Sequence, residues 1–438
     1  MANLLSWGRY PRQPQQPHAV NWSEDVPATL SAIAALKQGA TLAFGCGRSY
    51  GDSCLAESNH VLATSGMNRL LAADWETGII TAEAGLTLSE LTRIALPHGW
   101  FLSVTPGTQF VTLGGAVAND VHGKNHHVMG TFGCHVSHLT MIRSDEGLVE
   151  CSPVQRPELF AATVGGLGLT GIILTVTLQL RRVESNEIDQ RSIRFDNLDE
   201  FFALSKSHDV AHEYTVAWVD CLAKGKNAGR GHFICGNHAP NGQLKPIAPT
   251  GLAVPVDLPF SLVNPLSLGL FNTFYYHRQL HKDVASRVNY SSFFYPLDGL
   301  RQWNRIYGQA GFQQYQCVIP EQHGADVIRD IMNTIANSGS GSFLAVLKQC
   351  GKIPSIGLLS FPLHGVSLAL DFPQRDALNI RLFNKLDALV HEAGGRLYPA
   401  KDAHISSIHF KQAYPDWSKV EALRDPQLQS QFWKRVTQ

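Results

Sequence analysis

Three glycine-rich clusters in the first 185 residues constrain the fold of this chain more than any other feature. They span residues 44–52, 106–127 and 164–173. Glycine and small residues leave backbone N–H groups exposed, and such loops form anion-binding concavities that suit a pyrophosphate. Each cluster alone is compatible with a set of tight turns. As a set in this order, they predict a pyrophosphate-binding domain.

Two of these clusters have glycine spacings close to the dinucleotide-binding fingerprint. Residues 166–171 match GxGxxG by letter, but the strand-like run 172–180 follows them, whereas the fingerprint opens a helix. Residues 45–51 follow a predicted strand, but their third glycine comes one place too late. No GxxxxGK[ST] phosphate loop is present. The sequence therefore excludes a Rossmann-type NAD site.

Hydrophobic patterning divides the chain into two predicted domains. The first part alternates short strands at 41–44, 79–84 and 174–180 with a helix at 87–96, which Thr87 and Glu90 cap. Beyond Arg182 the pattern of the sequence changes: strand-like segments mix with helices, which are predicted at 325–336 and 376–393. We therefore expect a first domain at 1–185, a second at 186–395, and a tail at 396–438 that returns to the first.

Composition excludes several classes of protein. Lys and Arg number 36 and Asp and Glu number 36, so no global basic field favours nucleic acid. The eight cysteines include no CxxC pair, which argues against a disulfide framework or a cysteine-rich zinc site. No apolar run reaches the roughly 18 residues of a membrane span, and the start of the chain does not resemble a signal peptide. We expect a cytoplasmic protein that is soluble or peripheral to the inner face of the cell membrane.

The segment 251–276 is unusually apolar. It contains no Lys or Arg, and Asp257 is its only acidic residue. Its prolines, among them Pro265, argue against a helix that spans a membrane. Two interpretations stay open: a long loop that covers the second domain, or a mobile lid or membrane-facing flap over an apolar substrate.

The amino-acid sequences of the three clusters resemble those of a known family. GRSYGD at 47–52, GGAVANDVHGKNHH at 114–127 and ATVGGLGLTGII at 162–173 are similar to the FAD-binding domain of the vanillyl-alcohol-oxidase (PCMH-type) superfamily. Within it, the chain resembles the decaprenylphosphoryl-β-D-ribose 2′-oxidase family. The likeness continues through residues 295–308, 311–316, 359–362, 370–373 and 396–402, and is weakest across 186–285. It implies a two-domain α+β fold, with a PCMH-type FAD domain and a substrate domain on an antiparallel sheet.

The resemblance implies where FAD binds and that its attachment is non-covalent. Arg48 stands about where covalent members of the superfamily carry a histidine. Cys46 is the only nearby nucleophile, and we expect it to be buried. The FAD contacts implied are Gly45, Cys46, Gly47, Arg48, Ser49, Tyr50, Gly51, Asp52, Gly107, Thr112, Leu113, Gly114, Gly115, Asn119, Asp120, His122, Ile173 and Tyr398.

The resemblance also implies catalytic residues for oxidation of a sugar 2′-hydroxyl by hydride transfer to the flavin. Lys401 would stabilise the developing oxyanion or the anionic reduced flavin. Tyr50 would relay the proton. His122 would contact the substrate or its phosphate, with Lys124 as its charge partner.

Further substrate contacts are implied on the second domain. Gln314 and Gln316 alternate across Tyr315, so they share one face of a strand, and they match glutamines that line the sugar pocket. Lys348 matches a substrate-side position, where a cation suits a lipid phosphate. His126 and His127 are adjacent and point apart on regular structure, so no metal site is predicted there. Mycobacterial members carry a cysteine where this chain has Ala369.

The favoured function is oxidation of a polyprenylphosphoryl-β-D-ribose-like substrate to its 2′-keto sugar, the first half of an epimerisation to arabinose. A separate NAD(P)H-dependent short-chain reductase would complete it, and residues 251–276 would contact the membrane surface. One alternative is an alditol or aldonolactone oxidase acting on a soluble sugar. A second is a catalytically silent flavin- or lipid-binding protein, against which the presence of Tyr50, His122 and Lys401 together argues.

Overall fold

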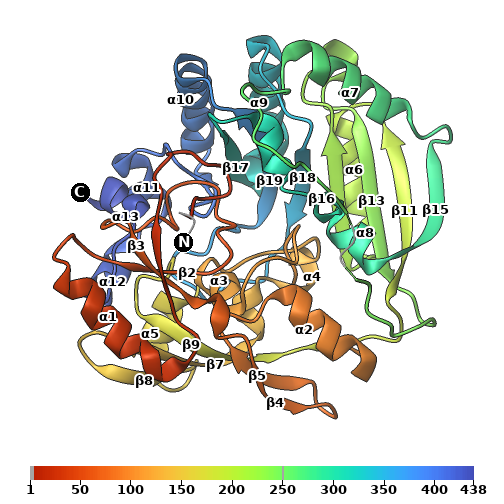
Figure 1. Ribbon diagram of the computed structural model, residues 1–438. Helices are drawn as coiled ribbons and strands as arrows, with labels where there is room; N and C mark the ends of the chain where they lie inside the picture. The colour runs from red at the N-terminus through yellow and green to blue at the C-terminus, as the bar shows by residue number, and fades with distance from the viewer. Residues whose placement is uncertain (1–3, 249–250) are drawn as a thin grey trace.

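The computed structural model, which describes residues 4–248 and 251–438, places two main sheets in the first 180 residues (Figure 1). The smaller sheet is parallel, in the order β1-β3-β2, and the larger is antiparallel, in the order β4-β5-β9-β7-β8. Their strands are β1 (Gln16–Ala19), β2 (Leu42–Phe44), β3 (His60–Ala63), β4 (Leu70–Asp74), β5 (Ile79–Glu83), β7 (Val136–Arg143), β8 (Gly147–Cys151) and β9 (Ile172–Gln179). The helices of this part are α1 (Val26–Ala35), α2 (Leu88–Ala95), α3 (Leu113–Ala118), α4 (His126–Met129) and α5 (Pro157–Thr163).

Local sequence signals account for these elements. Thr87 caps α2 as predicted: its hydroxyl accepts the N–H of Glu90 at 3.2 Å, and the Glu90 carboxylate accepts the N–H of Thr87 at 2.9 Å. The glycine cluster at 166–171 leads directly into β9, whose residues alternate between the two faces of the sheet. A strand after this cluster, rather than a helix, confirms that it is no dinucleotide fingerprint.

An eight-stranded antiparallel sheet forms the centre of the second half of the chain. Its order is β15-β11-β13-β12-β18-β19-β17-β20. The strands are β11 (Glu187–Phe195), β12 (Tyr214–Val219), β13 (Gly231–His238), β15 (Asp283–Asn289), β17 (Phe312–Pro320), β18 (Ala345–Cys350), β19 (Gly365–Pro373) and β20 (Arg396–Leu397). Sheets and helices together confirm the predicted α+β class.

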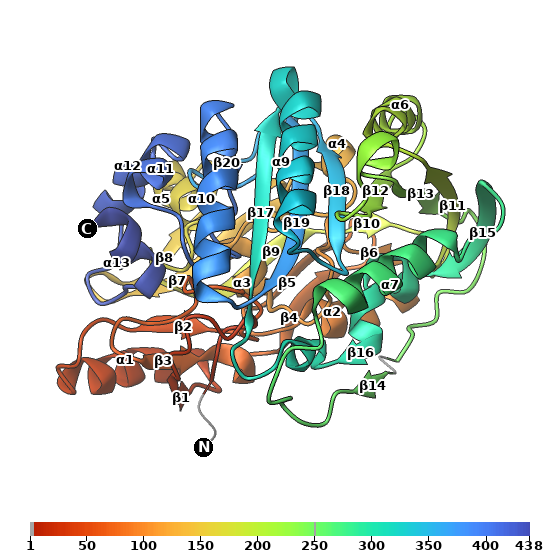
Figure 2. The same ribbon diagram turned by 90° about the horizontal axis from the view of Figure 1, so that it is seen from above.

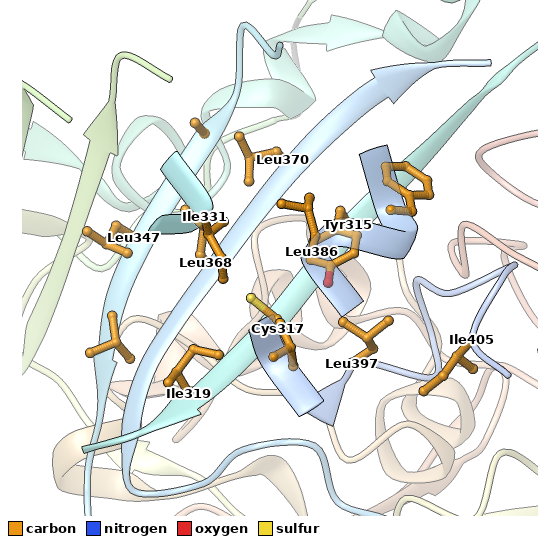
Figure 3. Close-up of a cluster of buried hydrophobic side chains, with 14 of the residues drawn as sticks. Tyr315, Cys317, Ile319, Ile331, Leu347, Leu368, Leu370, Leu386, Leu397 and Ile405 are labelled. Carbon is orange, nitrogen blue, oxygen red and sulfur yellow. The ribbon is translucent and has the colours of Figure 1, made fainter. Parts of the chain in front are cut away.

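Three helices cover one face of this sheet: α6 (Leu198–His208), α9 (Gly324–Ser338) and α10 (Asp376–Glu392). Tyr315, Cys317 and Ile319 of β17 point to that face and pack in a core with Ile331 and Leu386 of the helices (Figure 3). Each such side chain contributes about 1.5–3 kcal/mol when it is buried. Because strand side chains alternate, Gln314 and Gln316 are directed to the opposite face.

The predicted domain limits can be placed on these elements. Position 185 lies between β10 (Arg181–Arg182), which pairs with β6 (Trp100–Phe101), and β11 of the eight-stranded sheet. The tail begins with β20, which pairs with β17, and continues through α11 (Ser407–Ala413), α12 (Trp417–Ala422) and α13 (Gln431–Thr437). It then reaches the first sheets, where Leu428 bridges to Thr41 and the Arg435 guanidinium binds the Asp52 carboxylate at 2.9 Å.

The apolar segment 251–276 contains a two-residue strand and most of a 13-residue helix. After β14 (Leu252–Ala253), which pairs with β16 (Leu300–Arg301), α7 runs over Pro265–His277, and α8 (Tyr290–Phe294) follows. Pro265 begins α7, because proline at the first helical position loses no hydrogen bond. The Asn264 side chain caps the helix by accepting the N–H groups of Leu266 and Ser267, both at 3.1 Å. Within the described residues, no helix is both long and apolar enough to cross a membrane.

Candidate active site

A cavity of about 340 Å³ lies where the glycine clusters meet the face of the eight-stranded sheet opposite α6, α9 and α10. One wall, here called the loop wall, consists of residues 42–50, 106–122 and 167–173 where they line the cavity. The other, here called the sheet wall, consists of Gln314, Gln316, Leu344, Val346, Ala369, Asp371, Tyr398, Ala400 and Lys401. Segments far apart in the sequence therefore meet at this one site.

The loop wall presents backbone rather than side chains. The N–H groups of residues 46–49 donate to no acceptor in the described part of the chain. Gly47 has a φ of +60°, and a side chain at Gly45 would come within 2.4 Å of the Thr112 hydroxyl, so the loop requires glycine at both positions. A Cβ at Gly107 would meet nothing within 4 Å, which leaves open space beside the loop. Unpaired amides around open space suit a pyrophosphate.

Arg48 adds a buried positive charge to this wall. Its guanidinium lies over the Trp7 ring at 3.9 Å, and its Nε is buried with no hydrogen-bond partner among the described residues. The Asp298 carboxylate, opposite, accepts hydrogen bonds from the Thr108 hydroxyl at 2.7 Å and the Gln109 N–H at 2.9 Å. An unsatisfied guanidinium beside unpaired amides fits an anionic cofactor such as FAD.

The structure places most of the predicted FAD contacts in the cavity lining. Those that line it are Gly45, Cys46, Gly47, Arg48, Ser49, Tyr50, Gly107, Thr112, Gly114, Gly115, Asn119, His122, Ile173 and Tyr398. Four others lie behind the lining. Asp52 pairs with Arg435, Asp120 accepts the Gly133 N–H at 2.8 Å, Leu113 is buried in the core, and Gly51 packs against the Asp402 backbone.

Lys401 and Tyr50 meet at the junction of the two walls. The Lys401 ammonium lies 3.6 Å from the centre of the Tyr50 ring, a cation–π contact. Burial lowers the pKa of Lys401 to about 7, against the opposing effect of the nearby Asp371 carboxylate. Burial raises the pKa of Tyr50 well above its usual range, so the phenol stays protonated. Lys401 therefore changes charge near neutral pH, while Tyr50 can donate a hydrogen bond.

Asp371 completes this group, and sequence analysis missed it as a site residue. It is 1% exposed, and its carboxylate accepts a hydrogen bond from the Gln314 amide at 2.6 Å. Burial raises the pKa of Asp371 to about 7, against the opposing effects of Gln314 and Lys401. The alternation of residues 367–371 could have indicated this role, because it places Ala369 and Asp371 on one face of a strand. In the structure, Asp371 pairs with Gln314 and Ala369 with Gln316, across β17 and β19.

A second polar group surrounds His122. The Lys348 ammonium lies 2.7 Å from His122 Nδ1 and donates to the Gly123 carbonyl at 2.7 Å. Gln316 lies 3.2 Å from His122 Nε2. Burial and then the charge of Lys348 hold the pKa of His122 well below its usual range. Both ring nitrogens of His122 thus face nitrogen groups, Lys348 Nζ at Nδ1 and Gln316 Nε2 at Nε2, and the neutral imidazole can accept a hydrogen bond at one of them.

The structure does not bring the other predicted substrate cation to the cavity. The Lys124 ammonium donates to the Phe293 carbonyl and lies 4.5 Å from the centre of the Phe293 ring. Lys348, not Lys124, is the cation that contacts His122, although Lys348 itself lies behind the lining. His126 Nδ1 accepts the Gly351 N–H at 3.2 Å, whereas His127 Nε2 bonds the His212 carbonyl at 3.0 Å, so the two adjacent rings serve different partners.

Comparison with known proteins places the chain in a family. A family model described as "FAD binding domain" matches residues 20–152, which include the first two glycine clusters. The chain is 34% identical over 97% of its length to decaprenylphosphoryl-β-D-ribose oxidase of Mycolicibacterium smegmatis, covering 94% of that protein. The chain belongs to the decaprenylphosphoryl-β-D-ribose oxidase family. It is also 35% identical to an uncharacterized Streptomyces coelicolor protein, over 78% of this chain and 96% of that protein.

A more limited similarity joins this family member to L-gulonolactone oxidase of Mus musculus. It reaches 37% identity but covers 26% of each chain. The oxidase family and the matched domain identify the chain as an FAD-dependent oxidoreductase. FAD, when bound, supplies the hydride acceptor for the reaction. The loop wall fits the anionic part of FAD, and the sheet wall brings charged and amide side chains to the same space.

Proposed function

We propose that this oxidoreductase oxidises the 2′-hydroxyl of a polyprenylphosphoryl-β-D-ribose-like, lipid-linked pentose to the 2′-keto sugar, the first half of an epimerisation to arabinose. One observation carries the proposal: the similarity to the Mycolicibacterium smegmatis oxidase extends over 97% of the chain and so includes the sheet wall as well as the loop wall. The similarity to L-gulonolactone oxidase covers 26% of the chain, which does not favour the alternative of a soluble aldonolactone substrate.

The polar groups of the cavity support distinct roles in this reaction. Lys401, in its protonated form, stabilises negative charge as it develops on the sugar oxygen. Tyr50 donates a hydrogen bond and takes part in relaying the hydroxyl proton. Gln314 and Gln316 provide amide groups that fix the orientation of the pentose hydroxyls. Burial and the charge of Lys348 keep His122 neutral, and the contact of Lys348 with Nδ1 orients its ring.

An anaerobic reduction assay tests the proposed substrate. The holoenzyme is mixed with a polyprenylphosphoryl-β-D-ribose, and loss of the oxidised flavin absorbance is followed together with formation of the 2′-keto sugar. L-gulono-1,4-lactone and a soluble alditol serve as comparison substrates. We expect rapid flavin reduction with the lipid-linked ribose and not with the two comparison substrates. Reduction by the soluble compounds and not by the lipid-linked ribose would overturn the proposal in favour of the alternative.

We also propose that FAD binds without a covalent bond. Cys46, the nearby nucleophile considered from the sequence, is half-buried, and burial raises the pKa of its thiol, which makes it a poor nucleophile. Arg48 occupies the position expected for a covalent histidine. Denaturation followed by filtration should release all flavin into the filtrate. Flavin retained on the precipitate would show that the proposal is wrong.

Contact with a membrane surface is a further part of the proposal, and α7 supports it. Leu266, Leu270 and Phe274 are spaced four residues apart on one face of the helix and are 74%, 67% and 74% exposed. The opposite face packs through Leu268 into a cluster with Trp303, which lines the cavity. Figure 2 shows α7 at the edge of the molecule near β14 and β16. An exposed apolar face next to the cavity suits a lipid-linked substrate.

Vesicle flotation tests this contact. The double variant Leu266→Ser/Phe274→Ser should lose binding to lipid vesicles yet keep FAD. Val154→Ser, which removes a 92% exposed apolar side chain elsewhere, is the control and should bind vesicles as the unmodified protein does. Equal vesicle binding by all three proteins would contradict a role for α7.

A reductase partner follows from the chemistry of the product. A 2′-keto sugar becomes the arabinose epimer only when a hydride returns to C2 from the other face, so we propose an NAD(P)H-dependent short-chain reductase as the second enzyme. Adding such a reductase with NAD(P)H to the reaction should convert the keto product to the arabinose form. Accumulation of the keto sugar despite an active reductase would argue against this pairing.

A further inference from the structure

Two histidines and a cysteine converge on the substrate domain, outside the cavity. His208 ends α6, His212 follows one turn later, and Cys235 belongs to the neighbouring strand β13. One donor atom from each of these residues lies within 4.8 Å of the other two. The Cys235 sulfur is 3.8 Å from His208 Nδ1, and the two imidazole centroids are 5.2 Å apart. None of the three lines the cavity of the active site.

The local backbone explains why the two histidines share one side. The His212 N–H donates to the His208 carbonyl at 3.0 Å, so the chain makes one more helical turn beyond α6. Residues four apart on such a turn are neighbours on its surface. Cys235, in the middle of β13, reaches the same point because α6 packs against that strand, as both views of the molecule show (Figures 1 and 2).

One separation between donor atoms of this cluster is close to that in a zinc site. In a tetrahedral zinc site, metal–nitrogen and metal–sulfur bonds of about 2.0–2.3 Å place nitrogen and sulfur about 3.6 Å apart. The observed 3.8 Å between the Cys235 sulfur and His208 Nδ1 is close to this separation. The donor atoms lie within 4.8 Å of one another, so binding an ion requires the half-buried histidine side chains to turn towards Cys235.

The second ring nitrogen of His212 is already held as in metal sites. His212 Nδ1 lies 3.1 Å from the His208 carbonyl, to which it can donate. Histidine ligands commonly donate their other ring N–H to a carbonyl or carboxylate, which orients the ring and fixes the tautomer. This contact leaves Nε2 of neutral His212 without a proton and therefore able to bind a cation.

A neighbouring carboxylate, which is not one of the grouped donors, adds negative charge near the cluster. Asp209 follows His208, and its Oδ1 is buried with no hydrogen-bond partner among the described residues. Its Oδ2 accepts from the Ser205 hydroxyl at 2.7 Å. The charge of Asp209 acts on both His208 and Cys235. Arg191, the cation that acts on both of them, is paired with Asp283, whose two carboxylate oxygens accept from Arg191 Nε at 2.8 and 2.9 Å and from its Nη2.

We propose that His208, His212 and Cys235 bind one Zn²⁺ ion. Two imidazoles and a thiolate match the ligand preference of Zn²⁺, and a fourth carboxylate or water completes a tetrahedron. On binding, the sulfur–zinc bond forms as the thiol proton leaves to solvent, with no change in oxidation state. The ion would fasten the end of α6 to β13.

The site would also support the active-site region from outside. The His212 carbonyl receives a hydrogen bond from His127 Nε2 at 3.0 Å, and His127 lies in α4, which follows the loop that carries His122. An ion that fixes residues 208–212 would therefore also fix the carbonyl to which His127 is hydrogen-bonded, next to that loop. The expected role of the ion is structural, because the three ligands lie apart from the cavity lining.

Metal analysis of the full-length FAD-loaded protein, carried without an affinity tag, tests the proposal. After incubation with Zn²⁺ and gel filtration, we expect one tightly bound Zn²⁺ per chain. Loss of a partner in the outer shell of a metal site costs about 10- to 100-fold in affinity. Cys235→Ser and His212→Ala, which remove ligands, should therefore lose at least about 100-fold in competition with a chromophoric chelator.

Matched controls and a spectroscopic readout make the result specific. Cys134→Ser and His281→Ala remove a half-buried thiol and an exposed imidazole elsewhere and should bind Zn²⁺ like the unmodified protein. Co²⁺ should produce a thiolate-to-metal charge-transfer band, after subtraction of the flavin spectrum, that Cys235→Ser lacks. Zn²⁺ should raise the melting temperature of the unmodified protein and of the controls only.

Two results would overturn the proposal. One is an unmodified protein that binds Zn²⁺ no more tightly than Cys235→Ser does. The other is a Co²⁺ complex without a thiolate band. Because His212 is half-buried and follows a helix end, His212→Ala is expected to fold, and its circular dichroism and retained FAD would verify this. Unchanged Zn²⁺ affinity in that folded variant would exclude His212 as a ligand.

Discussion

The two walls of the cavity recognise their ligands by different means. The loop wall offers unpaired backbone N–H groups and glycines, with Arg48 as its cation. The sheet wall offers side chains, among them Gln314, Asp371 and Lys401, from strands and a loop that are distant in sequence. A backbone cradle recognises the common features of a cofactor, whereas side chains can change individually with the substrate. Damage to one wall should therefore affect FAD, and damage to the other should affect chemistry.

The largest effect is expected from Lys401→Ala. Removing a charge that stabilises a developing oxyanion typically costs 10²–10³ in rate, so substrate-driven flavin reduction should fall at least about 100-fold while FAD stays bound. Stopped-flow absorbance and the flavin content of the purified variant measure the two quantities. Lys385→Ala, on the exposed side of α10, is the control. Undiminished reduction in Lys401→Ala would end its assignment as a catalytic residue.

The loop wall should respond in the opposite manner to Gly107→Val. The new side chain would project into open space beside the loop and compete with the cofactor. Steric overpacking costs about 1–3 kcal/mol, so FAD affinity should fall roughly 10- to 100-fold, with an unchanged melting temperature of the FAD-free protein. Gly299→Val, whose side chain also meets nothing within 4 Å but lies outside the cavity lining, is the control. Equal FAD affinity in both variants would show that the loop wall beside Gly107 does not bind FAD.

Lys348→Met should have an intermediate effect that appears mainly in the pH profile. Without the neighbouring ammonium, the pKa of His122 should rise, because Lys348 now helps to hold it low. His122 would then gain a proton at a higher pH than before, and activity should decline on the acidic side. Because burial still holds the pKa of His122 below its usual value, the loss of rate at pH 6 should stay below about fourfold. A flat acidic limb in the variant, measured as the rate of flavin reduction, would exclude this positioning role.

The smallest effect is expected from Asp371→Asn. The negative charge of Asp371 raises the pKa of Lys401, which burial lowers to about 7. Its removal should lower the pKa of Lys401, so the protonated form is lost at a lower pH and the alkaline limb of the reduction rate shifts to lower pH. At pH 6 the rate should change less than about threefold. A shift of the alkaline limb to higher pH would show that the coupling has the opposite sign.

Residues of the loop wall could be predicted because their role is local. A glycine with positive φ, such as Gly47, or one pressed against Thr112 is required by its own backbone position. The resemblance to the family then identified FAD as the cofactor that this loop wall would bind. Lys124 shows where this reasoning fails. Its position beside His122 in the chain suggested a charge partnership, but its side chain turns to Phe293, a residue 169 positions away. Sequence proximity does not fix side-chain direction.

The sequence by itself determined several elements, such as the capped helix α2, together with the glycine cradle and the face on which Gln314 and Gln316 lie, because φ/ψ preferences and strand alternation act over a few residues. Only the tertiary structure decided the contacts that set the protonation states of the side chains in the site. Lys348 and His122 are 226 residues apart, and packing brings them within 2.7 Å. The same holds for the burial that moves the pKa of Asp371 and Lys401 towards neutrality. Desolvation depends on everything that surrounds a group, and no local pattern carries that information.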